Sequence, residues 1–289
     1  MAKKFLIRLF FVLVYIFAAI GFFLVAGYFA VRFGLTNEKG IIDTQREAFL
    51  SGAALLGQSA SVGANSQNTG PAYAGPWQQS EEWGILDQAI RRDQSTIERA
   101  AQDSGVPARL IVANLVAEQL RLFFTDREDY KKFFYPLKIL GPQSQFSWGV
   151  MGMKEATAVE VENNLKNPDS PYYPGTQYEH MLDFPATTTD FASARFTRMT
   201  DQHDHYWSYL YAGLYIKEVE AQWAKAGFPI EGKVGIISTL YNIGFAHSNP
   251  NANPQIGGAA ISLSDGTRAF GALAAEFYDS NLLTDIFPR

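Results

Sequence analysis

Apolar positions recur at helical spacing through the second half of the chain. Trp207, Leu210 and Leu214 follow one another three or four residues apart, which places them on one face of a helix. The same kind of pattern predicts helices over residues 205–226, 234–245 and 270–283. No internal repeat and no convincing series of alternating strands accompanies them. The periodicity therefore predicts a mainly α fold.

Two more helices are predicted earlier in the chain. Ser95 and Glu98 have the spacing of a capping box for a short helix that ends near Gly105. Pro107 suits the first turn of the next helix, because a residue there needs no N–H donor. This second helix should continue to about Phe124.

Two segments between the predicted helices lack a sustained period. Residues 131–147 and 167–200 are rich in Pro, Gly, Tyr and Phe, a composition that is typical of irregular chain. They are predicted to be loop excursions from the helical body, with room for a small sheet.

The N-terminus has a different pattern. No charged residue lies between Leu9 and Val31, and at about 1.5 Å rise per residue such a run crosses a hydrocarbon core of about 30 Å. Lys3, Lys4 and Arg8 precede it, so the positive-inside rule keeps this end in the cytoplasm and exports the rest. Residues 1–35 are therefore predicted to be a cytoplasmic stub and a single inner-membrane helix.

A cleaved signal peptide is the alternative for this segment, with small residues at Ala26 and Ala30 as cleavage positions. The apolar run is longer than the roughly 7–15 residues of a signal peptide, which favours the anchor. Residues 36–76 are rich in Gly, Ala, Ser, Asn and Gln and are predicted to be a flexible linker. Residues 77–289 are left for the folded domain.

Composition excludes several classes of function. The net charge of -5 is mild and unclustered, which argues against nucleic acid as a partner. The chain has no cysteine, so disulfides, thiolate metal sites and cysteine nucleophiles are excluded. A hydrophobic content of 47% is ample for a core that rests on packing alone.

The helix predicted over 107–124 carries the candidate chemistry. Asn114, Glu118 and Arg121 form one polar stripe on a helix that is otherwise apolar nearly all round. A carboxyl group held against apolar surface loses hydration in its charged form, so it favours the protonated state that a general acid needs. The alternative is that Glu118 pairs with Arg121 in a solvated stripe and stays charged.

Four short sequence fragments occur in a defined order along the chain. Gly105–Gln119 reads GVPARLIVANLVAEQ, Ser147–Gly152 reads SWGVMG and is followed by ATA at Ala156–Ala158, Gly213–Ile216 reads GLYI, and Tyr241–Gly244 reads YNIG. Each fragment alone is weak, but in this order they resemble the soluble lytic transglycosylase family of the lysozyme-like superfamily. The resemblance covers about residues 96–278. It departs from the family at Gln119, where Ser is commoner, and at Gly152, where the family has a Gln that contacts substrate.

This resemblance implies a lysozyme-like domain that binds peptidoglycan glycan strands. Glu118 would be the single catalytic acid and base, and Tyr241 would hydrogen-bond its carboxyl group. Asn242 and Gly244 would shape the adjacent cleft wall, and the backbone around Met151 would approach the sugar. The predicted substrate-binding residues are Ser147, Gly149, Val150, Met151, Tyr241 and Asn242. Trp148 is added to them because the flat C–H face of a sugar ring packs on an aromatic ring.

The implied reaction is cleavage of the β-1,4 bond between N-acetylmuramic acid and N-acetylglucosamine, with formation of a 1,6-anhydro sugar and no cofactor or metal. The domain would face the periplasm from its inner-membrane anchor. Two alternatives stay open. A lysozyme-type hydrolase would need a second carboxylate, for which Asp126, Glu128 and Asp129 are candidates. A noncatalytic scaffold would hold peptidoglycan within an envelope protein complex of unknown composition.

One other group of side chains is a weaker candidate for chemistry. Asp201, His203, Asp204 and His205 could ligate a metal, yet they lie where a helix should begin, and acidic residues there cap the helix and favour its dipole. No arrangement suggests a Ser-His-Asp triad.

Overall fold

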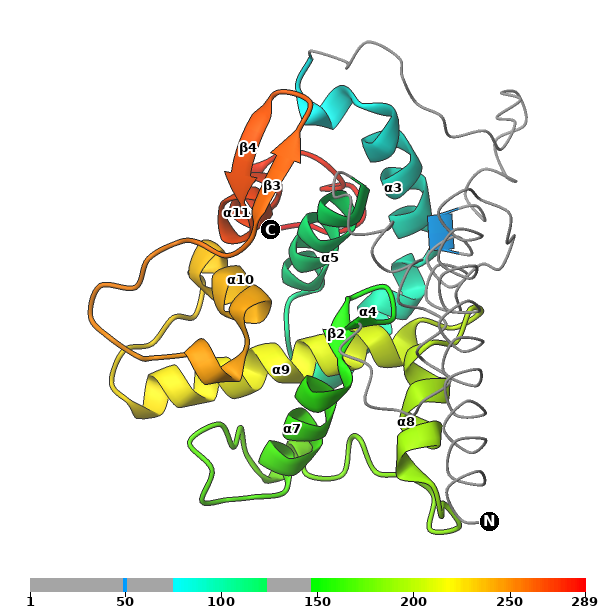
Figure 1. Ribbon diagram of the computed structural model, residues 1–289, viewed down its shortest axis with the longest axis vertical. Coiled ribbons are helices and arrows are strands. Elements are labelled where there is room, and N and C mark those ends of the chain that lie inside the picture. The colour runs from blue at the N-terminus through cyan, green and yellow to red at the C-terminus, as the bar shows by residue number, and fades with distance from the viewer. Residues whose placement is uncertain (1–48, 51–74, 124–146) are drawn as a thin grey trace, which may run out of the picture. The chain divides into compact units, whose positions relative to one another are not determined.

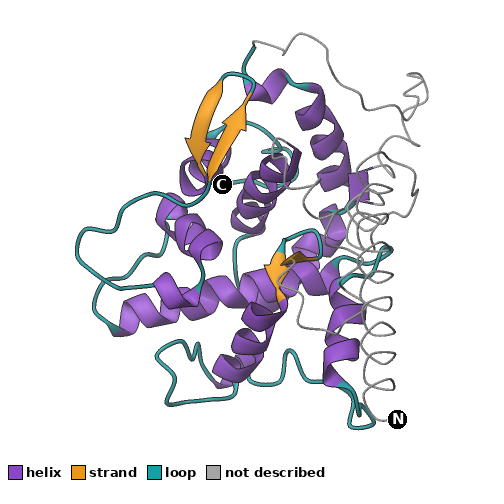
Figure 2. Cartoon of the chain, in the orientation of Figure 1, coloured by secondary structure: helices purple, strands orange, loops and turns teal. Residues whose placement is uncertain are grey.

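The computed structural model describes residues 49–50, 75–123 and 147–289. These residues belong to one compact unit. Within them the chain is mainly helical, with eight α-helices and two small antiparallel hairpins (Figures 1 and 2). The prediction of a mainly α class is confirmed.

The helices are α3 (Glu81–Arg92), α4 (Gln94–Ser104), α5 (Ala108–Phe123), α7 (Glu155–Leu165), α8 (Phe191–Met199), α9 (Tyr206–Lys225), α10 (Val234–Ile243) and α11 (Phe270–Asp279). Short 3-10 turns cover Trp77–Gln79, Thr176–Tyr178 and Phe245–His247. One hairpin pairs β1 (Ser147–Trp148) with β2 (Met153–Lys154), and the other pairs β3 (Ala260–Leu263) with β4 (Gly266–Ala269).

The observed helices differ from the predicted ones mainly at their ends. The predicted helices over 107–124 and 205–226 correspond closely to α5 and α9, whereas α11 ends at Asp279, four residues early. The predicted capping box is wrong, because α4 begins at Gln94 with Asp93 as its N-cap residue. The segment 167–200 is not entirely irregular, since it contains α8.

Local chemistry explains where α3 and α4 begin and end. The Ser80 side chain accepts a hydrogen bond from the backbone N–H of Trp83, and acidic residues occupy the first turn of α3, both of which stabilise a helix N-terminus. Gly105 ends α4 with a φ of 66°, a left-handed conformation that glycine adopts at little cost.

Helix α5 lies at the centre of the described unit, with α3, α4, α9, α10 and α11 against it (Figure 1). From Arg109 to Leu122 every residue is buried, which accounts for its almost continuous apolar sequence. Two long-range pairings complete the core, since α4 packs along α9 and α10 packs on α11. The central helix therefore places whatever polar groups it carries inside the protein.

Arg109 is the first of those polar groups. Its guanidinium donates five hydrogen bonds, all to backbone carbonyls near the C-terminus, those of Phe277, Tyr278, Ser280, Leu282 and Phe287. Desolvation by burial lowers the pKa of Arg109. Because a guanidinium has five N–H groups, this residue is fully satisfied and fastens the last residues of the chain onto α5.

Several predictions concern residues beyond the described ranges. The predicted anchor, 9–31, and the three candidate second carboxylates at 126, 128 and 129 all lie outside them. Among the described residues no helix is both long and apolar enough to cross a membrane.

Phe49 is described and falls within the predicted linker. Its side chain is fully buried, and its ring packs edge-on against that of His205 at 5.4 Å between centroids. Its carbonyl accepts a hydrogen bond from Arg92. At this residue the chain packs on the domain, where the composition predicts a flexible tether.

Candidate functional site

Glu118 lies on α5 and faces the interior. Its exposed fraction is 3%, and its neighbours along the polar stripe are similarly buried, with Asn114 at 0% and Arg121 at 7%. The alternative interpretation of the sequence requires a solvated stripe, but these three side chains are buried. Because α5 is apolar on nearly all sides, the whole helix is buried, and its polar residues are buried with it.

Arg121 pairs with Glu118 through both carboxylate oxygens. The Arg121 Nε donates to Oε2 at 3.1 Å, and Nη2 donates to Oε1. The two residues are three apart on the helix, a spacing at which side chains on one face meet. The pairing with Arg121 that the sequence left as an alternative is thus present, but in a buried setting.

The turn between β1 and β2 lies against this carboxylate. Gly149 and Gly152 both have positive φ, 69° and 64°, and allow the four-residue turn. A Cβ at Gly152 would lie 2.0 Å from Oε1 of Glu118. Only glycine fits there, so the backbone of the turn and the carboxyl group are in direct van der Waals contact.

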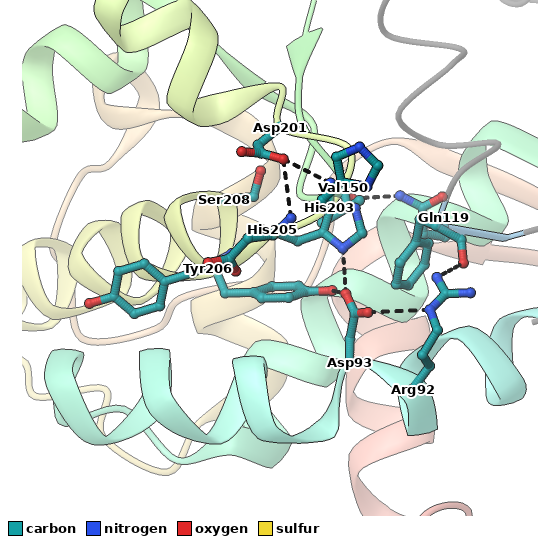
Figure 3. A network of polar contacts seen from close by, with 12 residues as sticks. Arg92, Asp93, Gln119, Val150, Asp201, His203, His205, Tyr206 and Ser208 are labelled. Carbon is teal, nitrogen blue, oxygen red and sulfur yellow. Dashed lines mark hydrogen bonds and ion pairs between the residues drawn. The ribbon is translucent and has the colours of Figure 1, made fainter. Parts of the chain in front are cut away.

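Two side chains from different helices bind the same turn. Gln119 Nε2, from α5, donates to the Val150 carbonyl at 2.5 Å (Figure 3). The Tyr241 hydroxyl, from α10, donates to the Met151 carbonyl at 2.7 Å. These hydrogen bonds to successive carbonyls fix the backbone of the turn.

Tyr241 therefore does not make the hydrogen bond that the resemblance implies. Its hydroxyl is bound to Met151 rather than to Glu118, although the two side chains are close enough to interact electrostatically. Burial raises the pKa of Tyr241 well above its ordinary value, and the negative charge of Glu118 raises it further. The ring packs edge-on against Tyr215 and parallel to Phe270, which keeps the hydroxyl directed at the turn.

Asn242 is held by the chain that leads into β3. Its Oδ1 accepts a hydrogen bond from the backbone N–H of Ala259 at 2.7 Å, so it positions the chain just before β3 rather than offering this oxygen to a ligand. Gly244 ends α10 with a φ of 87°, and nothing lies within 4 Å of the Cβ it lacks.

Trp148 does not present its ring as a platform for a sugar. It is 2% exposed and packs edge-on against Phe196 at 5.3 Å. Its indole N–H is buried without a hydrogen-bond partner. The expectation that Trp148 stacks on substrate is not supported, because its ring is part of the core beneath the hairpin.

The other residues of the hairpin that were predicted to bind substrate could reach it only with their backbone. Val150 and Met151 are buried, at 1% and 0% exposed, and Ser147 is half-buried on β1. The side chains of the turn thus anchor it in the core. What the turn presents toward Glu118 is main chain.

The acidic and histidine cluster before α9 serves the fold. Asp201 Oδ1 accepts backbone hydrogen bonds from His203 and Asp204, and Asp204 accepts from the N–H of Tyr206, as capping residues do. His205 does not join these contacts, because its Nδ1 lies 2.5 Å from Oδ2 of Asp93, to which it is hydrogen-bonded (Figure 3). No group of three or more metal-binding side chains occurs in the described part of the chain.

Two residues of α5 have roles that the sequence pattern does not predict. Gln119, which departs from the family pattern, binds the turn. Arg109 binds backbone carbonyls near the C-terminus, away from the site. A charged or amide residue inside a wholly apolar helix was the available signal, because such a group must find a partner when the helix is buried.

Comparisons of the chain with protein-family models, with curated proteins and with solved structures found no match. Any assignment of function therefore depends on the residues and their geometry.

Proposed function

We propose that the domain is a peptidoglycan lytic transglycosylase with a lysozyme-like fold, in which Glu118 is the catalytic acid and base. One observation carries the proposal. Three of the four fragments that resemble the family meet at a single place, although Gln119 and Val150 are 31 residues apart and Met151 and Tyr241 are 90 apart. Chance matches scattered along a sequence have no reason to converge on one buried carboxyl group.

In the proposed reaction Glu118, once protonated, donates its proton to the glycosidic oxygen. The β-1,4 bond breaks, and the resulting carboxylate takes the proton of the C6 hydroxyl as that oxygen closes the 1,6-anhydro ring. The nucleophile belongs to the substrate itself, so the step benefits from proximity. The turn that ends at Gly152 supplies a fixed wall of main chain beside the acid.

The Glu118–Arg121 contact favours a second candidate function. A carboxylate that is ion-paired with a guanidinium through both oxygens has no proton to donate as long as it stays ionised. A domain held in this state would bind glycan strands without cutting them. The noncatalytic scaffold is therefore the alternative, and its partners would be peptidoglycan and other envelope proteins.

The location proposed for the domain is the periplasm, tethered by a single-pass helix in the inner membrane. It follows from the uncharged run 9–31 and the basic residues before it. Peptidoglycan is then within reach, and neither a metal nor a cofactor enters the proposed chemistry.

The decisive experiment digests purified sacculi with wild type and Glu118→Gln and identifies the released sugars by mass. The variant keeps the size of the side chain but has no transferable proton, and loss of a positioned acid-base group slows a reaction by about 10²–10⁴. Glu231→Gln is the matched control, since Glu231 is exposed.

Three results separate the candidates. Anhydro sugars from wild type and almost none from Glu118→Gln support the transglycosylase. Reducing sugars in their place indicate a hydrolase. If neither protein cuts and both are retained on sacculi, the scaffold replaces the enzyme.

A further inference from the structure

Both carboxylate oxygens of Glu118, the proposed acid, already accept hydrogen bonds. Arg121 donates to Oε2 and to Oε1 of Glu118, and Gly152 closes another side of the carboxyl group with main chain. Tyr241, which could compete for the carboxylate, is held by Met151. Arg121 is thus the hydrogen-bond donor to both oxygens of Glu118 in the described residues.

Burial makes this pairing strong. The side chains of Arg121 and Glu118 are 8% and 4% exposed, so water competes little for either group. Breaking such a pair by removing one partner leaves a buried charge without compensation. Exchange of Glu118 for another anion at Arg121 would avoid that cost.

We propose that Arg121 is a lock on Glu118 and that a carboxylate of the substrate opens it. The inference rests on the proposed function and adds to it a recognition step, in which Arg121 binds a carboxylate that the glycan carries near the bond to be cut. On binding, the guanidinium moves from Glu118 to the substrate anion. Glu118 then takes up a proton from solvent and becomes the acid.

The chemistry of the guanidinium supports this exchange. Its planar fork binds carboxylates through two parallel N–H donors, so the substrate group replaces Glu118 in kind, and no covalent bond is made or broken. Among the described residues, Tyr241 on α10 interacts electrostatically with both partners. The β1–β2 turn meets Glu118 with the backbone of Gly152.

Peptidoglycan offers this carboxylate from two sources. The lactyl group of N-acetylmuramic acid is a free carboxylate when the strand has no peptide, and the stem peptide supplies carboxylates when it is attached. A chitin oligomer has neither. The lock therefore predicts a preference for anionic glycans over neutral ones of the same length.

Binding tests the lock without requiring any cleavage. The full-length protein in detergent is titrated with three ligands, namely glycan strands freed of peptide, strands with stems, and chitopentaose. Glu118→Gln removes the charge that holds Arg121, so it should bind the anionic strands about tenfold more tightly than Glu118→Gln/Arg121→Gln. The two variants should bind chitopentaose equally.

The controls cover folding and nonspecific charge. Glu118→Gln/Arg91→Gln removes an arginine whose partners, Asp87 and Asp285, lie at the surface, and it should bind like Glu118→Gln alone. Thermal melts of each variant show whether it is folded, and the double variant removes both members of the buried pair, so no lone charge is left. Strands freed of peptide that bind more tightly assign the lactyl carboxylate, and an effect confined to strands with stems assigns the peptide.

A second arm measures cleavage. Arg121→Gln should raise the rate on chitopentaose relative to anionic strands by about tenfold over the wild-type ratio. Equal binding of all ligands by Glu118→Gln and the double variant, with an unchanged rate ratio, would overturn the lock. Binding that depends on Arg121 in a protein that never cuts would keep the carboxylate site and remove the transglycosylase, so the two failures are distinguishable.

Discussion

Gly152 touches Glu118 so closely that a Cβ on the glycine would lie 2.0 Å from the Oε1 atom. The residue that departs from the family pattern is therefore matched to the carboxyl group it faces. A glutamine at this position would displace Glu118 or unfold the turn. The glycine is a fitted part of this site.

Gly152→Ala should destabilise the domain for two reasons. An alanine pays about 1–2 kcal/mol for a left-handed backbone, and the clash with Glu118 adds about 1–3 kcal/mol of overpacking. Gly227→Ala is the matched control, because Gly227 has a φ of 83° with nothing within 4 Å of a Cβ. Chemical denaturation should show a clearly larger loss for Gly152→Ala, and equal losses would mean that Glu118 yields without cost.

Tyr241→Phe should weaken the site without abolishing it. The change deletes the hydrogen bond to the Met151 carbonyl, at a cost of about 0.5–1.5 kcal/mol, and loosens the turn beside Glu118. Stability should fall by that amount, and sugar release from sacculi should fall by about two- to tenfold. A loss as complete as that of Glu118→Gln would instead make Tyr241 a direct participant in catalysis.

Glu218 makes stability depend on pH. Its side chain is fully buried on α9, with one oxygen bound by Asn164 and the other without a partner. Desolvation by burial raises the pKa of Glu218 well above 4.5. Between the ordinary pKa of a glutamate and the raised pKa of Glu218, the unfolded state has released the proton and the folded state still holds it. The free energy of unfolding therefore falls as pH rises through this range.

The measurement compares wild type with Glu218→Gln from pH 4 to pH 8. Stability of wild type should decline by up to about 1.4 kcal/mol per pH unit relative to the variant, until the folded-state pKa is reached. Glu231→Gln changes an exposed residue and should follow wild type. Parallel curves for wild type and Glu218→Gln would show that Glu218 is ionised in the folded protein.

A topology experiment tests the N-terminal prediction. A reporter fused after Arg289 should be active only if it works in the periplasm, because Lys3, Lys4 and Arg8 hold the N-terminus inside. The mature protein should also keep its first 35 residues. Cytoplasmic reporter activity would remove peptidoglycan as a substrate, and a new N-terminus after Ala30 would convert the anchor into a signal peptide.

The amino-acid sequence by itself determined the helical class and the position of the central helix. The helix around Leu115 is apolar nearly all round, apart from one polar stripe, so its sequence predicts a helix that is buried nearly all round, and α5 is such a helix. Gly105 likewise predicts its own role as the end of α4. These features depend on neighbours within a few residues, which a sequence displays directly.

Only the tertiary structure decided the partners of the polar groups. Glu118 pairs with Arg121, which the sequence left as an alternative, and only the tertiary structure shows that both side chains of the pair are buried. Tyr241 binds the Met151 carbonyl, and Asn242 binds the chain before β3. A hydrogen bond needs a donor–acceptor distance of about 3 Å. Which donor comes that close to which acceptor depends on the packing of helices that are distant in sequence.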